Sequence, residues 1–245
     1  MSSIIQGLSY VEDFVGEEYE KELIDKLQTM EWNTSISRRT QHYGWMYPYG
    51  SSTKLIPAPP IPKWMLPLKS IVEEYLNFTR SFNQVIVNEY LPGQGIAPHI
   101  DDPTLFGDTI VSVSLGSGIE MDFTNVKDTK SKQALYLSRR SILILSGDAR
   151  YLFQHSIAKR KKDHSIPRGT RISITFRSTN ANHTSSESSV TPITNDSNII
   201  VDSISESESS HPTNNTNNTN IPLPPLGGEN WRIILDDAYS KVFHD

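Results

Sequence analysis

Cysteine is absent from this 245-residue sequence. This absence excludes disulfide bonds, thiolate metal ligands and a cysteine nucleophile. Any bound metal would therefore be held by histidine and carboxylate side chains, the ligands that hard or borderline ions prefer. Long apolar runs are also missing, because the longest are only a few residues, as in Ile142–Leu145, whereas a membrane-spanning helix needs about 20. The first residues lack the basic start and apolar core of a secretory signal, so we expect a protein without membrane spans in the cytoplasm, the nucleus or both.

Aromatic and basic residues are absent from one long segment. Residues 178–228 contain five acids but no Lys, Arg, Phe, Trp or Tyr, and are dominated by Ser, Thr and Asn. Such a segment cannot bury enough apolar surface to offset its chain entropy. We therefore predict a folded domain at 1–178, a disordered linker at 179–228 and a short tail with helical potential at 229–245. The net charge of −5 comes from the end of the chain, which leaves the predicted domain near neutral and neither requires nor forbids a nucleic-acid partner.

Hydrophobic periodicity divides the predicted domain into two parts. Spacings of three and four predict helices at 17–30 and 64–78. The stretch between them, 33–62, is rich in aromatics, Pro and Gly and is predicted as loops with a hairpin. Alternation with a period of two then predicts many short strands, and this pattern is typical of an antiparallel sandwich or barrel within an α+β domain. The predicted strands are 83–90, 111–115, 119–123, 135–137, 142–145 and 171–177.

Three residues in the strand-rich part suggest a metal site. His99 and Asp101 are two residues apart, so in an extended chain both would point the same way. A second histidine, His155, follows the predicted strands at 135–145. Two histidines and one carboxylate form the facial triad of non-haem Fe(II) oxygenases, which leaves positions for an α-keto acid and dioxygen. An ordinary surface pair at 99 and 101 is the alternative, and His164 is a rival for the second histidine.

A keto acid would also need a cation for its second carboxylate. Arg171 and Arg177 are candidates because they share one face of the predicted strand at 171–177, and a guanidinium binds a carboxylate through a two-pronged fork. An exposed antiparallel strand would show the same alternation. Asn88 and Tyr90 share a face of their own strand and could hydrogen-bond the same carboxylate.

Taken together, the motifs Asn88–Gly93, His99–Asp101, His155 and Arg171–Arg177 resemble the AlkB family of Fe(II)/2-oxoglutarate dioxygenases over about residues 7–178. The resemblance implies a double-stranded β-helix, or jelly-roll, with the two N-terminal helices packed outside. It implies Fe(II), 2-oxoglutarate and O2 as cofactor and co-substrates. The implied iron ligands are His99, Asp101 and His155. The implied 2-oxoglutarate contacts are Asn88, Tyr90, Arg171, Arg177 and Ser173, the last standing where the family often has Asn.

Longer strings, such as Ile110–Ser117 and Gly147–Leu152, are similar to the branch of this family that hydroxylates 5-methoxycarbonylmethyluridine at the wobble position of tRNA. This similarity implies the tRNA anticodon loop as partner, with a separate tRNA methyltransferase as a further candidate. We expect a monomer. Residues 38–49 mix cations with aromatics, as lids over unpaired bases do, although a loop covering the barrel is the alternative. The residues proposed to contact substrate are Arg38, Arg39, Tyr43 and Tyr47.

One departure from the family bears on the substrate. DNA-repair members often place an acid two residues after the aspartate ligand, where this chain has Pro103. This difference argues against repair of alkylated bases. Two alternatives stay open: an AlkB-type oxidative demethylase of alkylated nucleic acid or protein, and a non-catalytic RNA-binding module. The run Lys159–Lys162 could meet a phosphate backbone or be a solvated turn.

Overall fold

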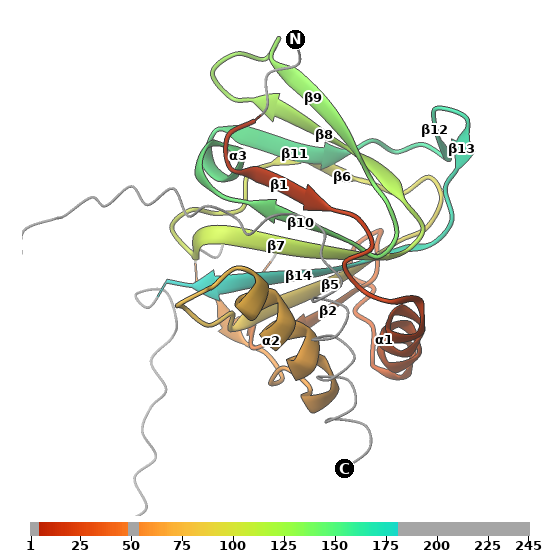
Figure 1. Cartoon of the computed structure of the whole chain (residues 1–245), viewed down its shortest axis with the longest axis vertical. Helices are drawn as coiled ribbons and strands as arrows, with labels where there is room; N and C mark the ends of the chain where they lie inside the picture. The colour runs from red at the N-terminus through yellow and green to blue at the C-terminus, as the bar shows by residue number, and fades with distance from the viewer. Residues whose placement is uncertain (1–4, 49–53, 181–245) are drawn as a thin grey trace, which may run out of the picture. The chain divides into compact units, whose positions relative to one another are not determined.

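Two antiparallel β-sheets face one another in the computed structural model, which describes residues 5–48 and 54–180 (Figure 1). Residues 181–228 of the predicted linker and the tail at 229–245 lie outside the described residues, whereas Thr179, the predicted first residue of the linker, ends a strand and is buried. The larger sheet contains, in spatial order, β1 (Leu8–Val11), β10 (Ser141–Leu145), β7 (Phe106–Gly116), β14 (Arg171–Thr179), β5 (Gln84–Tyr90) and β2 (Thr40–Tyr43). The smaller sheet contains β6 (Ile96–His99), β11 (Phe153–Ile157), β8 (Ile119–Asn125) and β9 (Lys132–Leu137). This arrangement confirms the α+β jelly-roll prediction.

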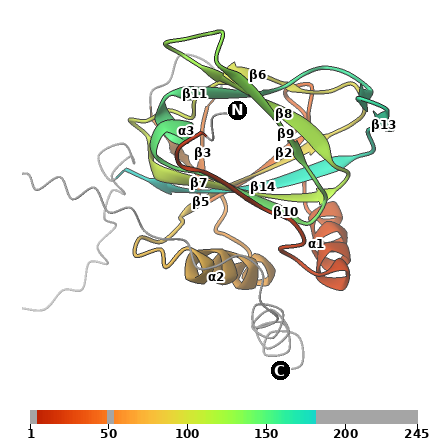
Figure 2. The same ribbon diagram turned by 45° about the horizontal axis from the view of Figure 1, so that its top comes forward.

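Both predicted helices pack on the outer face of the larger sheet (Figure 2). They are α1 (Glu17–Thr29) and α2 (Leu66–Tyr75), the latter preceded by a 3₁₀ turn at Lys63–Met65. Their apolar stripes include Leu23, Leu27 and Leu68, all fully or almost fully buried. Pro67 lies in the first turn of α2, where the missing N–H costs no helical hydrogen bond. The sheet is therefore covered on its outer face by helices that the sequence pattern predicts.

The alternation of β14 divides its side chains between two environments. Ile172, Ile174 and Phe176 belong to the core beneath the helices, whereas Arg171 and Arg177 project from the opposite face toward the smaller sheet. Arg171 is only 1% exposed, so the reading of residues 171–177 as an ordinary exposed strand is wrong. The space between the sheets is filled by a second apolar core and, at one end, by the polar residues described below.

Several short elements differ from the sequence prediction. β1, β2, β6 and β11 were not among the predicted strands. The residues of β2, Thr-Gln-His-Tyr, do not alternate between apolar and polar types. A five-residue helix, α3 (Gly147–Tyr151), stands where a turn was expected. The remaining short pairs are β3 (Trp45–Met46) with β4 (Ile56–Pro57), which is the hairpin predicted within 33–62, and β12 (Lys162–Asp163) with β13 (Ile166–Pro167). Within the described ranges no helix is long and apolar enough to span a membrane.

Candidate active site

A cavity of about 50 Å³ between the two sheets collects the residues that the motifs single out. All three predicted iron ligands and all five predicted 2-oxoglutarate contacts line it. The strands place them there from different parts of the chain, because β5, β7 and β14 of the larger sheet face β6, β8 and β11 of the smaller one. These eight residues are Asn88, Tyr90, His99, Asp101, His155, Arg171, Ser173 and Arg177.

The two histidines are brought together by strand register. His99 at the end of β6 is paired with His155 of β11, and their ring centroids are 4.3 Å apart. The Nε2 atom of His155 lies 3.9 Å from Oδ2 of Asp101. In the part of the chain that the structure describes, no three His, Cys, Asp or Glu side chains form a closed ligand set. Two ligands at right angles, each about 2.1 Å from a shared first-row ion, are about 3.0 Å apart. The 3.9 Å between these two atoms is therefore within about 1 Å of the spacing that one shared ion requires.

Hydrogen bonds and burial prepare these groups as ligands. Nδ1 of His99 lies 2.8 Å from the carbonyl oxygen of Ala97, and because a carbonyl only accepts, Nδ1 carries a proton, which leaves Nε2 as the nitrogen that can bind a metal. Burial lowers the pKa of His155 to about 4, so its ring is neutral at pH 7. Burial alone would raise the pKa of Asp101, but the positive charge of Arg177, with smaller contributions from the two imidazoles, lowers it to about 2. Neutral imidazoles and an ionised carboxylate are the donor forms that Fe(II) requires.

The sequence spacing suggested that His99 and Asp101 lie on one strand. In the structure β6 ends at His99, so Asp101 lies outside it. Two arginines instead hold Asp101 at the cavity. Arg177 donates from Nη2 to its Oδ1 at 2.6 Å, and Arg150 donates from Nη1 to its backbone carbonyl at 2.6 Å. The aspartate therefore reaches the histidines through side-chain contacts rather than through strand geometry.

Arg171 is a buried cation without a carboxylate among its hydrogen-bond partners in the described residues. Its Nη2 donates to the hydroxyl of Ser114 at 2.9 Å, and its buried Nε has no acceptor. Its guanidinium carbon lies 5.4 Å from the centre of the Tyr90 ring. Burial lowers the pKa of Arg171 to about 10, which still leaves it charged at pH 7. A buried charge of this kind is costly unless an anion accompanies it, so the cavity is suited to a carboxylate.

The remaining predicted 2-oxoglutarate contacts surround this guanidinium with polar atoms. The hydroxyl of Ser173 lies 2.7 Å from that of Ser112 and 3.3 Å from that of Thr175. Asn88 accepts at Oδ1 from Nε of Arg38 at 2.8 Å. Hydroxyl and amide groups of this kind can hydrogen-bond the oxygens of a bound dicarboxylate. The residues present therefore fit both Fe(II) and 2-oxoglutarate.

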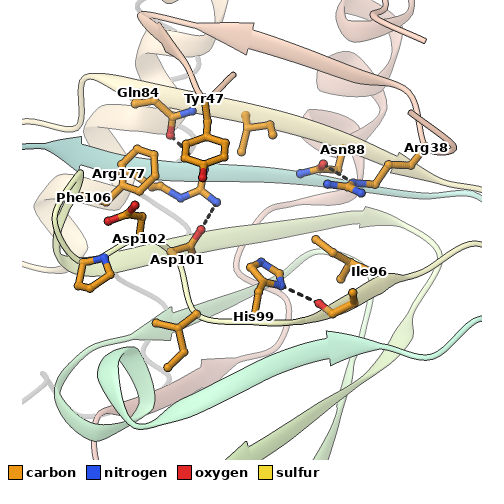
Figure 3. Close-up of a pocket in the computed structure, with 14 residues that line it drawn as sticks. Arg38, Tyr47, Gln84, Asn88, Ile96, His99, Asp101, Asp102, Phe106 and Arg177 are labelled. Atoms are coloured by element: carbon orange, nitrogen blue, oxygen red, sulfur yellow. Dashed lines mark hydrogen bonds and ion pairs between the residues drawn. The ribbon is translucent and has the colours of Figure 1, made fainter. Parts of the chain in front are cut away.

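A larger, open pocket of about 610 Å³ adjoins the cavity (Figure 3). It shares with the cavity Asn88, Ile96, His99, Asp101 and Arg177, so an occupant would lie against two of the predicted metal ligands. Of the four residues proposed to contact substrate, Arg38 and Tyr47 line this pocket. The lining is completed by Gln84, Ile86, Ala97, Ile100, Asp102, Pro103 and Phe106.

The other two proposed contact residues lie elsewhere. Arg39 donates to both carboxylate oxygens of Glu89, at 2.6 and 2.8 Å, and lies over the Trp32 ring. Tyr43 is 4% exposed in the core beneath the helices and donates to Oε1 of Gln41. Side chains alternate along β2, which turns Tyr43 away from the pocket. These positions do not support substrate contacts for Arg39 and Tyr43.

His164, the rival for the second histidine, is also placed away from the cavity. It lies between β12 and β13, is largely exposed, and its Nε2 is 2.7 Å from Oε2 of Glu120. The neighbouring Asp163 is fully buried and is bound by both Arg160 and Arg168. The basic run at 159–162 is therefore partly used in ion pairs that fix this hairpin.

Three residues of the site were missed by the motif analysis. Gln84 accepts from Nη1 of Arg177 at 3.1 Å, and the period of β5, which it shares with Asn88, could have indicated it. Phe106 lies 4.9 Å from the guanidinium of Arg177. Arg150 is buried beneath the pocket wall. It lies in the string Gly147–Leu152 noted above, but that string did not assign it a role in the site.

Comparison with known proteins agrees with this geometry. A family model described as the 2OG-Fe(II) oxygenase superfamily matches residues 7–177. Uncharacterized protein L905 of Acanthamoeba polyphaga mimivirus is 38% identical, over 71% of this chain and 85% of that protein. The tRNA (carboxymethyluridine(34)-5-O)-methyltransferase alkbh8 of Xenopus tropicalis is 37% identical over 66% of this chain, but the match spans only 26% of that protein. The structure of OsALKBH1 is similar in fold, with a TM-score of 0.54 and 20% identity, over 72% of this chain and all of that chain.

Proposed function

Because the chain belongs to the AlkB family within the 2OG-Fe(II) oxygenase superfamily and is a 2-oxoglutarate-dependent dioxygenase, we propose that it hydroxylates the 5-methoxycarbonylmethyl group of the wobble uridine in tRNA. The proposal has two parts. The first assigns the cofactor-binding residues, and the second assigns the substrate.

The observation that carries the first part is the charge of Arg171. It is buried, protonated and free of any carboxylate partner among the described residues, in the same cavity as His99, Asp101 and His155. An anionic co-substrate that reaches this cavity would supply the missing counter-charge. In this proposal His99, Asp101 and His155 hold Fe(II), and Arg171 binds the far carboxylate of 2-oxoglutarate.

The chain's own residues bind the metal and the co-substrate, orient them and exclude water from the site. Iron with 2-oxoglutarate and O2 supplies an oxidising centre that converts 2-oxoglutarate to succinate and CO2 and inserts the second oxygen atom into a C–H bond. Arg177 keeps Asp101 ionised and fixes the direction of its carboxylate. Tyr90 and Ser173 surround the co-substrate, while Ile86 and Phe106 give the adjoining pocket apolar walls.

Four observations support a nucleoside of tRNA as the substrate. The frog relative is named for a reaction at carboxymethyluridine 34 of tRNA. The adjoining pocket of about 610 Å³ lies within the range of small-molecule sites and is open. It presents Arg38 and Tyr47, a cation and an aromatic ring of the kinds that contact phosphates and bases. Pro103 lines the pocket where DNA-repair members often have an acid.

Nucleoside mass spectrometry tests the proposal. tRNA that carries 5-methoxycarbonylmethyluridine is incubated with the purified protein, Fe(II), 2-oxoglutarate, O2 and ascorbate, and Asp101→Ala is the control. We expect that nucleoside to gain one oxygen with the wild-type protein and to stay unchanged with the control.

Succinate formation separates the two parts of the proposal. If succinate forms with the wild-type protein but not with Asp101→Ala, and the nucleoside gains no oxygen, the metal assignment is supported and the wobble-uridine substrate is wrong. Alkylated nucleic acids and proteins would then be tested, in that order.

A further inference from the structure

The guanidinium of Arg150 lies buried beneath the loop that connects β6 to β7. Arg150 is 2% exposed and belongs to α3. It donates from Nη1 to the carbonyl of Asp101 at 2.6 Å and from Nε to the carbonyl of Gly107 at 3.1 Å. Nη2 is 3.4 Å from the carbonyl oxygens of both Asp102 and Phe106. All four acceptors are backbone oxygens, so this side chain acts on the course of the main chain.

The four carbonyls are placed at the two ends of one loop. Those of 101 and 102 begin it, and those of 106 and 107 end it, while residues 103–105 form a turn. One guanidinium thus closes the loop from its buried side. A lysine could not do this, because its three donors share one nitrogen, whereas a guanidinium spreads five donors over three nitrogens in a plane.

This loop contributes to both parts of the site. Asp101 at its start is a proposed iron ligand, and Asp102, Pro103 and Phe106 form a wall of the adjoining pocket. Arg150 itself stands five residues before His155, the proposed ligand on β11. One buried side chain therefore connects the segment of the second histidine, the aspartate and the pocket wall.

The loop has further support that is more exposed. The side-chain amide of Asn180 donates to the carbonyls of Pro103 and Thr104, at 3.4 and 3.0 Å. A third contact, 3.4 Å to the carbonyl of Phe106, reaches the end of the loop that Arg150 also holds, but none of the three involves Asp101. Within the described residues, the hydrogen bond to the carbonyl of Asp101 comes from Arg150.

We propose that Arg150 is a positioning residue of the dioxygenase, which sets the carboxylate of Asp101 and the pocket wall at a fixed spacing from His155. The inference rests on the proposed iron ligands. Arg150 touches none of the reacting groups and acts through the backbone of the loop. Its loss is expected to weaken metal binding even where the fold survives, because residues that orient metal ligands typically change metal affinity 10–100-fold.

Metal binding without turnover tests this role. Co(II) is titrated into the wild-type protein, Arg150→Met and Arg150→Lys in the presence of 2-oxoglutarate, with calorimetry for affinity and visible absorption for ligand geometry. Each titration is run well below the Tm of the variant. We expect Arg150→Met to bind Co(II) about 10–100-fold more weakly and with a changed visible spectrum, and Arg150→Lys to lie between it and the wild type.

Arg168→Met is the matched control. Arg168 is also a buried arginine, but its partners are Asp163 and the carbonyl of Ala158, and it does not line the cavity or its adjoining pocket. We expect this variant to lower the Tm and to leave Co(II) affinity and the spectrum unchanged. That contrast separates positioning from general stability.

Two outcomes overturn the inference in different ways. Co(II) binding by Arg150→Met within twofold of the wild type, with the same spectrum, would show that the metal site does not depend on this side chain. If Arg150→Met does not fold, Arg150→Lys is measured instead, and a wild-type Co(II) affinity with an unchanged spectrum in that variant would likewise overturn the inference. A wild-type protein that binds no Co(II) would instead refute the proposed ligand set itself.

Discussion

Replacement of Arg171 by methionine tests whether this buried charge serves the stability of the fold or the binding of 2-oxoglutarate. Arg171 is 1% exposed, and its hydrogen bond in the described structure goes to the hydroxyl of Ser114. Without a bound anion, burial of the guanidinium costs desolvation free energy that this hydrogen bond offsets only in part. Apolar replacement of buried charged groups is often neutral or stabilising, so we expect the ligand-free Arg171→Met protein to unfold at the wild-type Tm or above it.

Binding of 2-oxoglutarate should respond in the opposite direction. A guanidinium and a carboxylate can form two charge-assisted hydrogen bonds, each contributing about 1.5–3 kcal/mol. Losing both removes about 3–6 kcal/mol of binding free energy, which raises the Kd of 2-oxoglutarate roughly 10²–10⁴-fold. Calorimetry in the presence of Mn(II) measures this directly for wild type and variant.

Thermal unfolding provides an independent readout. At a 2-oxoglutarate concentration 100 times its Kd, the ligand stabilises the wild-type protein by about 2.7 kcal/mol, which corresponds to a Tm rise of about 5–10 °C for a domain of this size. The variant should show no rise at that concentration. A variant that loses several degrees of Tm but binds 2-oxoglutarate within tenfold of the wild type would refute the reasoning, because Arg171 would then serve the fold and not the ligand.

Three further predictions concern the fold and the pocket. Asp163→Asn breaks a fully buried ion pair and should cost about 3–5 kcal/mol of unfolding free energy. Burial alone would raise the pKa of Asp163, but the hydrogen bonds from Arg168 and Arg160 outweigh it and lower the folded-state pKa from 3.8 to about 2, so its stabilising contribution is present above about pH 4 and is lost as the pH falls toward 2. The unfolding free energy of the variant should therefore fall less steeply with decreasing pH over this range. Gly95→Ala places a methyl group 2.1 Å from the carbonyl oxygen of Ile157 and should lower the Tm by an amount equivalent to about 1–3 kcal/mol; an unchanged Tm would contradict this. Arg38→Gln should raise the KM for tRNA at least several-fold, as measured by product formation. Because Arg38 also donates to Asn88, the 2-oxoglutarate Kd is measured by calorimetry and tRNA turnover is compared at saturating 2-oxoglutarate; an unchanged KM would remove Arg38 from the substrate site.

Sequence patterns predicted the parts of the fold that depend on repeated local signals. Both helices and most strands of four residues or more follow from periodicity, because each has one face in a core. β2 was not predicted because its residues, Thr-Gln-His-Tyr, do not alternate between apolar and polar types. α3 is one turn long, too short for a helical period to be recognised.

The candidate site was predictable where its residues are held by strand register, and less so elsewhere. Asn88 and Ser173 are cross-strand neighbours, so the two alternations alone place them together. Tyr43 was assigned to the lid from its residue type, although the alternation of β2 turns it into the core. Arg150 lies in the string Gly147–Leu152, but its role could not be inferred from sequence, since its partners are backbone carbonyls and any residue can supply those.

The two faces of β14 have a practical consequence for changing what this protein does. Residues at even positions, such as Ile174, hold the helices to the sheet, while those at odd positions, such as Thr175, face the cavity. The same separation holds in β5, where Val87 lies under the helices and Ile86 lines the pocket. A combinatorial library that randomises only the cavity-facing positions of the pocket would leave the helix-side core intact. The strand pattern that first indicated a sandwich thus also marks where diversity can be introduced when selecting for new substrates.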